Sequence, residues 1–292
     1  MQLQGAITAL VTPFKNGKID EEKYREHIEW QIKQGIDGVV PCGTTGESAT
    51  LSHEEHKKVI QICVEQVKGR VPVLAGAGSN STREAIELTR FAKEAGADAV
   101  LLITPYYNKP TPAGLLAHYQ AIAQEVSIPM VVYNVPSRTG LNVTPDVAYT
   151  LFNEVDNIIG IKEASANLRQ VAEIRERCGE EFIILSGDDF TILPLLALGG
   201  KGVISVVSNI VPKLVHQLWA NFEAGQIKEA SKIQVDLLAL TRMLFIETNP
   251  IPVKTALSLM GKMDFEVRLP LTEMRPENKE KLRGVLKDYH LI

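Results

Sequence analysis

The residue best suited to do chemistry in this 292-residue sequence is Lys162, which directly follows the apolar residues 158–161. Partly dry surroundings favour the neutral form of a lysine amine, and a neutral amine can attack a ketone carbon to give an imine. The protonated imine then acts as an electron sink and makes the adjacent carbon acidic. A lone lysine at a strand end is more often solvated or in a salt bridge, so its neighbours must decide its role.

Hydroxyl groups and one arginine lie at comparable places in the sequence. Tyr133 can move protons to and from a carbinolamine, although a core aromatic is the plain alternative, and Thr44 and Tyr107 can extend a hydroxyl relay to solvent. The loop 43–47 can offer N–H groups and hydroxyls to a carboxylate, or can simply be a tight turn. Arg138 suits a second carboxylate because its guanidinium binds bidentately, unless it is a surface arginine.

Other sequence signals for cofactors and metals are weaker. His53 and His56 are three residues apart, but no His-x-His ends the first predicted strand and no carboxylate cluster accompanies them, so we predict no metal site. The glycines of residues 76–78 lack the third glycine of a dinucleotide fingerprint. The loop 43–47 is not followed by the Gly-Lys-Ser/Thr of a phosphate-binding loop.

The elements that must position these residues follow a repeated pattern. A short β-branched run is followed by an amphipathic stretch and a Gly-containing turn, roughly every 20 to 35 residues, which is the size of one βα unit. The eight runs are residues 6–11, 38–42, 71–75, 99–104, 130–134, 158–162, 182–187 and 202–206. With no antiparallel hairpin signal, this favours an α/β fold of the (β/α)8 TIM-barrel type over a doubly wound sheet. Active sites of such barrels lie at the C-terminal ends of the strands, where the reactive residues above are found.

Helix signals complete the predicted architecture. Helices are predicted over 20–34 with Asp20 as N-cap, over 52–67 with a capping box of Ser52 and Glu55, over 81–95 and over 111–125. Further helices are predicted over 213–224, 227–246, 252–260 and 276–289. We therefore predict a barrel over residues 1–224 and a C-terminal helical extension over 225–292, packed together as one structural unit.

Composition narrows the possible partners. The net charge is −4, the pI is about 5.9, and no Lys/Arg-rich run occurs, so neither nucleic acid nor a membrane is expected as a partner. No segment has the roughly 18 uninterrupted apolar residues of a membrane span, and the N-terminus resembles a first strand more than a signal peptide. Three widely spaced cysteines are most simply reduced thiols, which favours a cytoplasmic location.

Six motifs occur in the order and spacing typical of one known family. They are GTTGES, ITPYYNKPT, YNVPSRTG, IGIKEA, LSGDD and GVISVVSN, and the C-terminal segment ETNPIPVK extends the match. Over essentially its whole length the sequence resembles the dihydrodipicolinate synthase family, within the superfamily of Schiff-base pyruvate aldolases and lyases.

The resemblance implies a condensation of pyruvate with L-aspartate 4-semialdehyde in lysine biosynthesis, without a metal or organic cofactor because the lysine is the electron sink. Lys162 would form the imine and Tyr133 would be the general acid/base. Thr44 and Tyr107 would complete the relay, with the tyrosine contributed by a neighbouring subunit across a tight dimer. The remaining substrate-binding residues implied are Thr45, Arg138, Gly187 and Ile204.

The resemblance also implies regulation and assembly. The residues that match the lysine-binding pattern of lysine-inhibited members are Ser48, Ala49, His53, His56, Asn80, Glu84 and Tyr106, so feedback inhibition by L-lysine is expected. Glu84 could pair with the ligand ammonium, and Asn80 and Tyr106 could hold its carboxylate. A homotetramer made of tight dimers is expected.

Two other functions remain open at this stage. One is another keto-acid aldolase of the superfamily, such as an N-acetylneuraminate lyase or a keto-deoxy sugar acid aldolase. Those lyases usually carry Ser-Thr where this chain has Thr44 and Thr45, and they lack an arginine at the position of Arg138. The other is a non-catalytic barrel that binds keto acids, which would not need the imine-forming Lys162.

Overall fold

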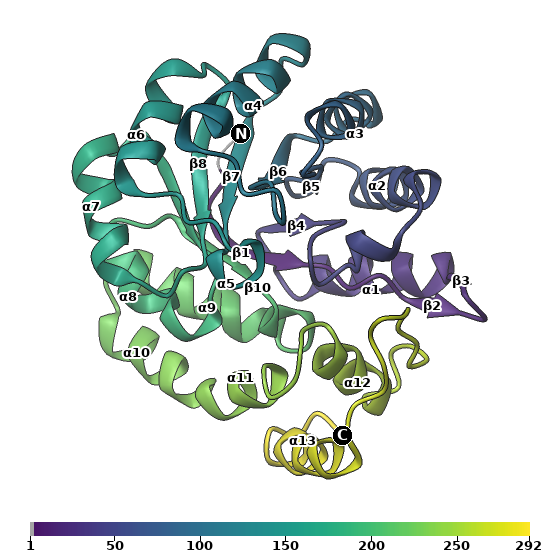
Figure 1. Ribbon diagram of the computed structural model, residues 1–292. Helices are drawn as coiled ribbons and strands as arrows, with labels where there is room; N and C mark the ends of the chain where they lie inside the picture. Colours follow the sequence, from purple (N-terminus) through teal and green to yellow (C-terminus); the bar gives the residue numbers. More distant parts are fainter. Residues whose placement is uncertain (1–2) are drawn as a thin grey trace.

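The computed structural model describes residues 3–292, and a sheet of eight parallel strands forms its centre (Figure 1). The strands are β1 (Gly5–Ala9), β4 (Gly38–Val40), β5 (Leu74–Gly76), β6 (Ala99–Ile103), β7 (Met130–Asn134), β8 (Ile158–Glu163), β9 (Ile183–Ser186) and β10 (Gly202–Ser205). Their order is β4-β1-β10-β9-β8-β7-β6-β5, and a parallel bridge between Val39 and Val73 joins the two edge strands into a barrel. Each of the eight predicted runs overlaps one of these strands.

Helices surround the barrel, as Figure 1 shows. They are α1 (Glu21–Lys33), α2 (His53–Val67), α3 (Thr82–Ala95), α4 (Pro112–Glu125), α5 (Pro136–Thr139), α6 (Pro145–Glu154), α7 (Leu168–Cys178), α8 (Ile192–Ala197) and α9 (Pro212–Glu223). Short 3-10 helices are η1 (Ser48–Thr50), η2 (Asp189–Thr191) and η3 (Val207–Asn209). The predicted caps are confirmed, because Asp20 accepts from the N–H of Lys23 and the capping box of Ser52 and Glu55 is complete.

One prediction about the strands was wrong. A two-stranded antiparallel hairpin, β2 (Phe14–Lys15) with β3 (Lys18–Ile19), projects beside α1. Its turn residues Asn16 and Gly17 both have positive φ, at 54° and 76°. An Asn-Gly pair is a strong hairpin signal because both residues tolerate the left-handed conformation that such a turn needs. The signal was in the sequence, but the flanking strands are too short to show alternation.

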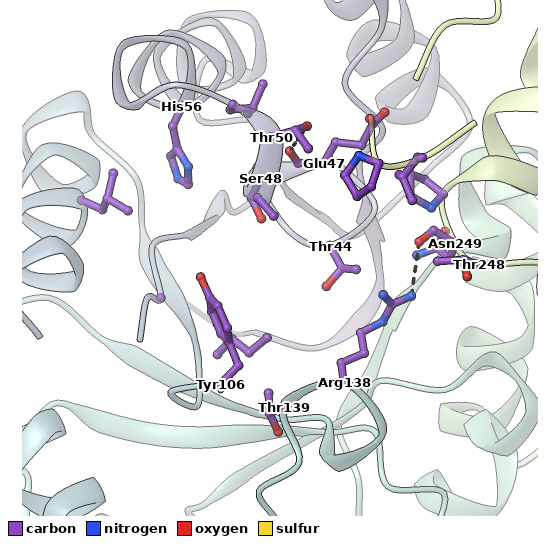
Figure 2. A pocket seen from close by; sticks show the side chains of 18 of the residues that line it. Thr44, Glu47, Ser48, Thr50, His56, Tyr106, Arg138, Thr139, Thr248 and Asn249 are labelled. Carbon is purple, nitrogen blue, oxygen red and sulfur yellow. Dashed lines mark hydrogen bonds between the residues drawn. The ribbon is translucent and has the colours of Figure 1, made fainter. Parts of the chain in front are cut away.

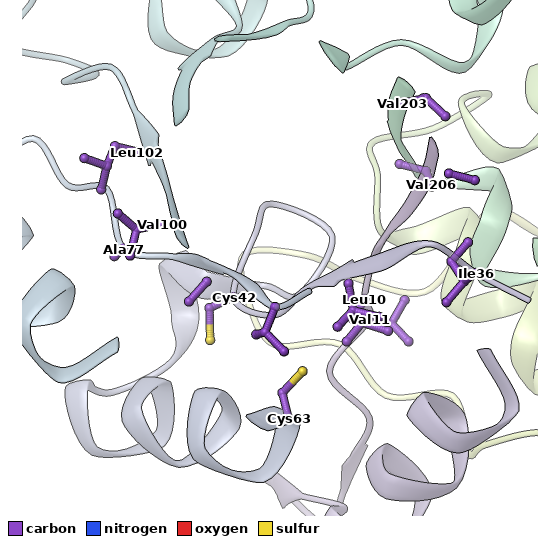
Figure 3. Packing of buried hydrophobic residues seen from close by; sticks show 14 of the residues in the cluster. Leu10, Val11, Ile36, Cys42, Cys63, Ala77, Val100, Leu102, Val203 and Val206 are labelled. Atoms are coloured by element: carbon purple, nitrogen blue, oxygen red, sulfur yellow. The ribbon is translucent and has the colours of Figure 1, made fainter. Parts of the chain in front are cut away.

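The core has two layers. An inner cluster fills the barrel with side chains such as Ile7, Leu74 and Leu185. A larger cluster packs the outside of the strands against the helices, and Figure 3 shows part of it, including Cys42 and Cys63. These two cysteines and Cys178 are buried and free, as expected for reduced thiols.

Four helices follow α9 and form the C-terminal extension. They are α10 (Ile227–Asp236), α11 (Leu238–Leu244), α12 (Ile251–Leu259) and α13 (Pro276–Asp288). The single helix predicted over 227–246 was wrong: a turn at Leu237 divides it, and it ends at Leu244 because Phe245 leaves the helical region at φ −120°. In residues 3–292 no helix is long and apolar enough to cross a membrane. The division of the chain at residues 224 and 225 stays a prediction.

Candidate active site

Lys162 and Tyr133 lie side by side in the mouth of the barrel. Their strands are neighbours in register, with Tyr133 of β7 opposite Lys162 of β8. Both side chains are buried, at 6% exposed for the lysine and 7% for the tyrosine. The Lys162 Nζ lies 4.1 Å from the centroid of the Tyr133 ring. An amine and a phenol are therefore held together in a largely dry place, which suits imine formation and proton transfer.

The loop after β4 carries Thr44 and Thr45. Its turn is closed by hydrogen bonds from the N–H of Gly46 to the Gly43 carbonyl at 3.1 Å and from the N–H of Glu47 to the Thr44 carbonyl at 3.1 Å. Within residues 3–292 the N–H groups of Thr44 and Thr45 donate to no protein acceptor, so they remain available to an anionic ligand. Successive unpaired N–H groups of this kind form a nest for a carboxylate.

A small cavity of about 40 Å³ connects Thr44 to Tyr133. This is about the volume that one water molecule occupies. The cavity is also lined by Ser48 and by the glycines Gly76 and Gly78. A hydroxyl relay between the threonine and the tyrosine can therefore run through water in this cavity.

Asn249, just before α12 in the C-terminal extension, connects the Thr45 side chain to Arg138. Its Nδ2 donates to the Thr45 Oγ1 at 2.9 Å, and its carbonyl accepts from the Arg138 Nη2 at 3.2 Å (Figure 2). The sequence analysis assigned no role to Asn249, although it belongs to the matched segment ETNPIPVK. Because the Thr45 Oγ1 accepts this bond, its hydroxyl proton is directed elsewhere, and Thr45 can offer a ligand both its O–H and its N–H.

Gly187 follows β9 and Ile204 lies in β10, so both lie on the Lys162 side of the pair formed by Lys162 and Tyr133. A Cβ at Gly187 would lie 3.0 Å from the Lys162 Cε and 2.6 Å from the Ala164 Cβ, so any larger residue would displace the lysine. Ile204 belongs to the inner core together with Tyr133. The structure thus brings six of the predicted catalytic and pyruvate-site residues to one end of the barrel.

Tyr107 does not reach the site of its own chain. It is 91% exposed, and its φ of 70° together with the Asn108 N–H to Tyr106 carbonyl bond at 2.8 Å turns the loop outward. A tyrosine so exposed is free to enter a second copy of the chain, as the resemblance implies.

A wider cavity in the mouth has a volume of about 380 Å³ and joins the substrate residues to the predicted lysine-binding residues (Figure 2). Thr44, Arg138 and Asn249 line one part of it. The predicted lysine-binding residues that line it are Ser48, Ala49, His53, His56, Glu84 and Tyr106. Asn80 is not in the lining, and its amide donates to the Tyr106 carbonyl at 3.2 Å.

Glu84 is the centre of a polar cluster in this cavity. Its carboxylate accepts from the Ser79 hydroxyl and pairs with His53, and both contacts hold its pKa below the usual value. His56 contacts the Gly76 carbonyl through Nε2 at 2.7 Å, and burial lowers its pKa. An ionised carboxylate beside a neutral imidazole can receive an ammonium group. Within residues 3–292 no three His, Cys, Asp or Glu side chains are grouped to hold a metal ion.

Comparison with known proteins decides the family. Residues 2–289 match the dihydrodipicolinate synthetase family. The chain belongs to this family. The resemblance predicted from the six motifs is therefore confirmed.

Individual relatives are similar over their full lengths. The chain is 62% identical over 286 residues to a 4-hydroxy-tetrahydrodipicolinate synthase of Nitratidesulfovibrio vulgaris, covering 98% of each chain. Its fold matches the crystal structure of dihydrodipicolinate synthase from Aquifex aeolicus with a TM-score of 0.97 and 50% identity, covering 99% of each. It also matches the enzyme of Cyanidioschyzon merolae with lysine bound, with a TM-score of 0.96, 40% identity and 99% coverage of each.

Proposed function

We propose that this chain is a 4-hydroxy-tetrahydrodipicolinate synthase, which condenses pyruvate with L-aspartate 4-semialdehyde through an imine on Lys162. The observation that carries the proposal is the buried pair of Lys162 and Tyr133, with 4.1 Å between the amine nitrogen and the ring centroid. The full-length similarity to relatives of that name supports it. Both substrates of this reaction carry a carboxylate, and the mouth of the barrel offers two groups that can bind one: the loop with Thr44 and Thr45, and the guanidinium of Arg138.

The first half of the reaction joins pyruvate to the enzyme. The Lys162 amine attacks the C2 carbonyl, and the carbonyl oxygen leaves as water after protonation by Tyr133. The pyruvate carboxylate rests on the N–H groups of Thr44 and Thr45. Loss of a methyl proton to the same tyrosine then gives an enamine, with Thr44 and a partner copy's tyrosine at position 107 carrying protons to solvent.

The second half forms the carbon–carbon bond. The enamine carbon attacks the aldehyde carbon of the second substrate, whose carboxylate is bound by Arg138. The substrate's own amino group then attacks the imine carbon, which closes the ring and releases the Lys162 amine. Asn249 keeps Arg138 in reach, because its carbonyl holds the guanidinium.

Substrate assays separate this reaction from that of a sugar-acid aldolase. The enzyme should consume pyruvate and L-aspartate 4-semialdehyde and should not cleave N-acetylneuraminate. Arg138→Leu should raise the KM for the semialdehyde about tenfold or more while pyruvate still forms the imine. Arg169→Leu is the matched control, because Arg169 makes only a surface pair with Glu173. Cleavage of N-acetylneuraminate, with no condensation, would refute the proposal.

Inhibition by L-lysine is the second part of the proposal. The lysine ammonium would bind the Glu84 carboxylate and displace the His53 ring, which contacts that carboxylate in the cavity. L-lysine at millimolar concentration should inhibit the native enzyme, and Glu84→Gln should abolish the inhibition. Glu87→Gln should retain it, since Glu87 lies one turn further along α3 and pairs with Arg83 at the surface. A native enzyme insensitive to millimolar lysine would contradict this part.

The assembly is proposed to be a tetramer of tight dimers in which Tyr107 enters the neighbouring site. Complementation tests this directly. Tyr107→Ala and Lys162→Ala should each be inactive, or nearly so, when pure. In a mixed dimer one site would combine an intact Lys162 with an intact Tyr107, so mixing and reassociating the two variants should restore activity. If mixed dimers are shown to form and activity does not recover, the proposal of a site shared between two subunits is refuted.

A further inference from the structure

A second pair of residues follows the catalytic pair on the same two strands. Strand residues alternate between the two faces of a sheet, so the residues after Tyr133 and Lys162 face away from the barrel interior. Asn134 of β7 is opposite Glu163 of β8 in the register. The Asn134 Nδ2 donates to the Glu163 Oε2 at 2.9 Å. The strands that carry the amine and the phenol are thus linked by a side-chain hydrogen bond one residue further on.

This bond belongs to a network of four polar side chains, of which Asn134, Glu163 and Gln170 are buried and Asn142 reaches the surface. The Gln170 Nε2 of α7 donates to the same Glu163 Oε2 at 2.9 Å and to the Asn142 Oδ1 at 3.2 Å. Asn142 in turn donates to the Gln170 Oε1 at 2.8 Å and accepts from Asn134 at 2.9 Å. The Asn134 Oδ1 accepts from the N–H of Val143 at 2.9 Å. Every polar side-chain atom of Asn134, Asn142 and Gln170 has a hydrogen-bond partner. A shift of β7 or β8 relative to α7 would therefore break several hydrogen bonds.

Glu163 is the acceptor at the centre of the network. Three donors converge on it, because the Ser165 N–H also donates to its Oε1 at 2.6 Å. Among the ion pairs of residues 3–292 none includes Glu163, so its buried carboxylate is held by these hydrogen bonds and not by a cation. Only an ionised carboxylate accepts on both oxygens, whereas a glutamine would turn an N–H₂ group toward N–H donors. The position therefore requires a carboxylate and not merely a polar residue.

We propose that Glu163 is a positioning residue for the imine-forming step: through Asn134 and Gln170 it fixes β7 and β8 against α7 and so holds the Lys162 amine beside Tyr133. This inference rests on the proposed imine chemistry. A network placed directly behind the catalytic pair, in the same register, fixes both strand ends at once. Gly187 adds to the constraint from β9, since its N–H donates to the Glu163 carbonyl at 2.7 Å.

The test follows the rate at which borohydride traps the pyruvate imine on Lys162, measured by mass spectrometry at short times. In folded Glu163→Gln this rate should fall about tenfold to a hundredfold, because displacement of a reacting group by about 1 Å has effects of that size. The KM for the aldehyde substrate should stay within about twofold, since Arg138 and Asn249 are not in the network.

If Glu163→Gln does not fold, a second pair of variants tests the positioning role of Glu163. Gln170→Leu removes one donor to Glu163, while His118→Leu removes a side chain of the same 5% exposure whose bond is to Thr82 on a neighbouring helix. Gln170→Leu should slow trapping several-fold and His118→Leu should not. Equal trapping rates in this pair, or a folded Glu163→Gln trapped within twofold of the native rate, would overturn the proposal. Absence of label on the native Lys162 would instead refute the proposed function itself.

Discussion

At the scale of single residues, the two threonines of the loop after β4 are not equivalent. The Thr45 Oγ1 accepts from Asn249, whereas Thr44 lines both the wider cavity and the small cavity beside Tyr133. Thr44 shares the small cavity with Tyr133 and Thr45 does not line it, which supports the proposed relay role of the Thr44 hydroxyl. The resemblance in sequence assigned Thr44 to the relay and Thr45 to substrate binding, and the different surroundings of the two side chains agree with that division.

The phenolic hydroxyl of Tyr133 is expected to carry the proton transfers. Tyr133→Phe should lower kcat by about 10²- to 10⁴-fold, the usual contribution of general acid–base catalysis. The melting temperature should change little, because the ring keeps its place against Lys162 and in the inner core. Steady-state kinetics with both substrates measure the effect, and Tyr149→Phe on the exposed face of α6 serves as control. A kcat within threefold of native would remove Tyr133 from the mechanism.

At the scale of elements, the C-terminal extension is built into the active-site mouth. Lys254 of α12 donates to the Glu47 Oε1 at 2.6 Å, and both side chains are almost fully buried, at 0% and 1% exposed. The N–H of Arg268 donates to the other oxygen of Glu47 at 3.1 Å. Glu47 lies two residues beyond Thr45 and has a left-handed φ of 55°, so the extension holds a strained loop in place.

Breaking that buried pair should cost stability. Lys254→Met leaves the Glu47 carboxylate buried without its cation, which costs about 3–5 kcal/mol of unfolding free energy. Adding Glu47→Gln should recover much of the loss, because the stranded charge disappears. Urea unfolding measures both effects. Lys232→Met, which removes a surface pair with Asp236, should change the free energy by less than about 1 kcal/mol. An equally small effect of Lys254→Met would show that the pair is dispensable.

Elements were predictable where a local pattern determines them. The eight strands and the caps at Asp20 and Ser52 follow from runs and capping residues within a few positions. The hairpin at Asn16 was missed because its strands have two residues each. The contacts of the extension could not be predicted, since Thr45 and Asn249 are separated by 204 positions and no local pattern records such a pairing.

At the scale of the whole molecule, buried histidines set the response to acid. Burial lowers the pKa of His27 and of His118 to about 4, from 6.5. Both are neutral in the fold, so their contribution to stability is present above pH 6.5 and is lost as pH falls toward 4, where the unfolded chain binds protons that the fold does not. Asp189 acts in the opposite sense, because burial raises its pKa to about 6 and the fold takes up its proton first.

Replacing one of these histidines isolates its contribution to the pH dependence of the free energy of unfolding. His118→Leu should reduce the loss of unfolding free energy between pH 7 and pH 4 by about 3 kcal/mol, from a shift of about 2.5 pKa units at 1.36 kcal/mol each. Urea unfolding across this pH range measures the difference from native. Because the comparison is between two chains that share His27 and Asp189, the effects of those groups cancel. Parallel pH profiles for the two proteins would show that His118 does not titrate as described.

The central claim is that Lys162 forms an imine with pyruvate, and borohydride reduction tests it most directly. Reduction of the native enzyme with pyruvate present should add one reduced pyruvate unit per chain, and peptide mass spectrometry should locate it on Lys162. Without pyruvate no such addition should occur, and Lys162→Arg should remain unlabelled. A native protein that condenses the two substrates while Lys162 stays unmodified, or carries the label on another lysine, would contradict the account.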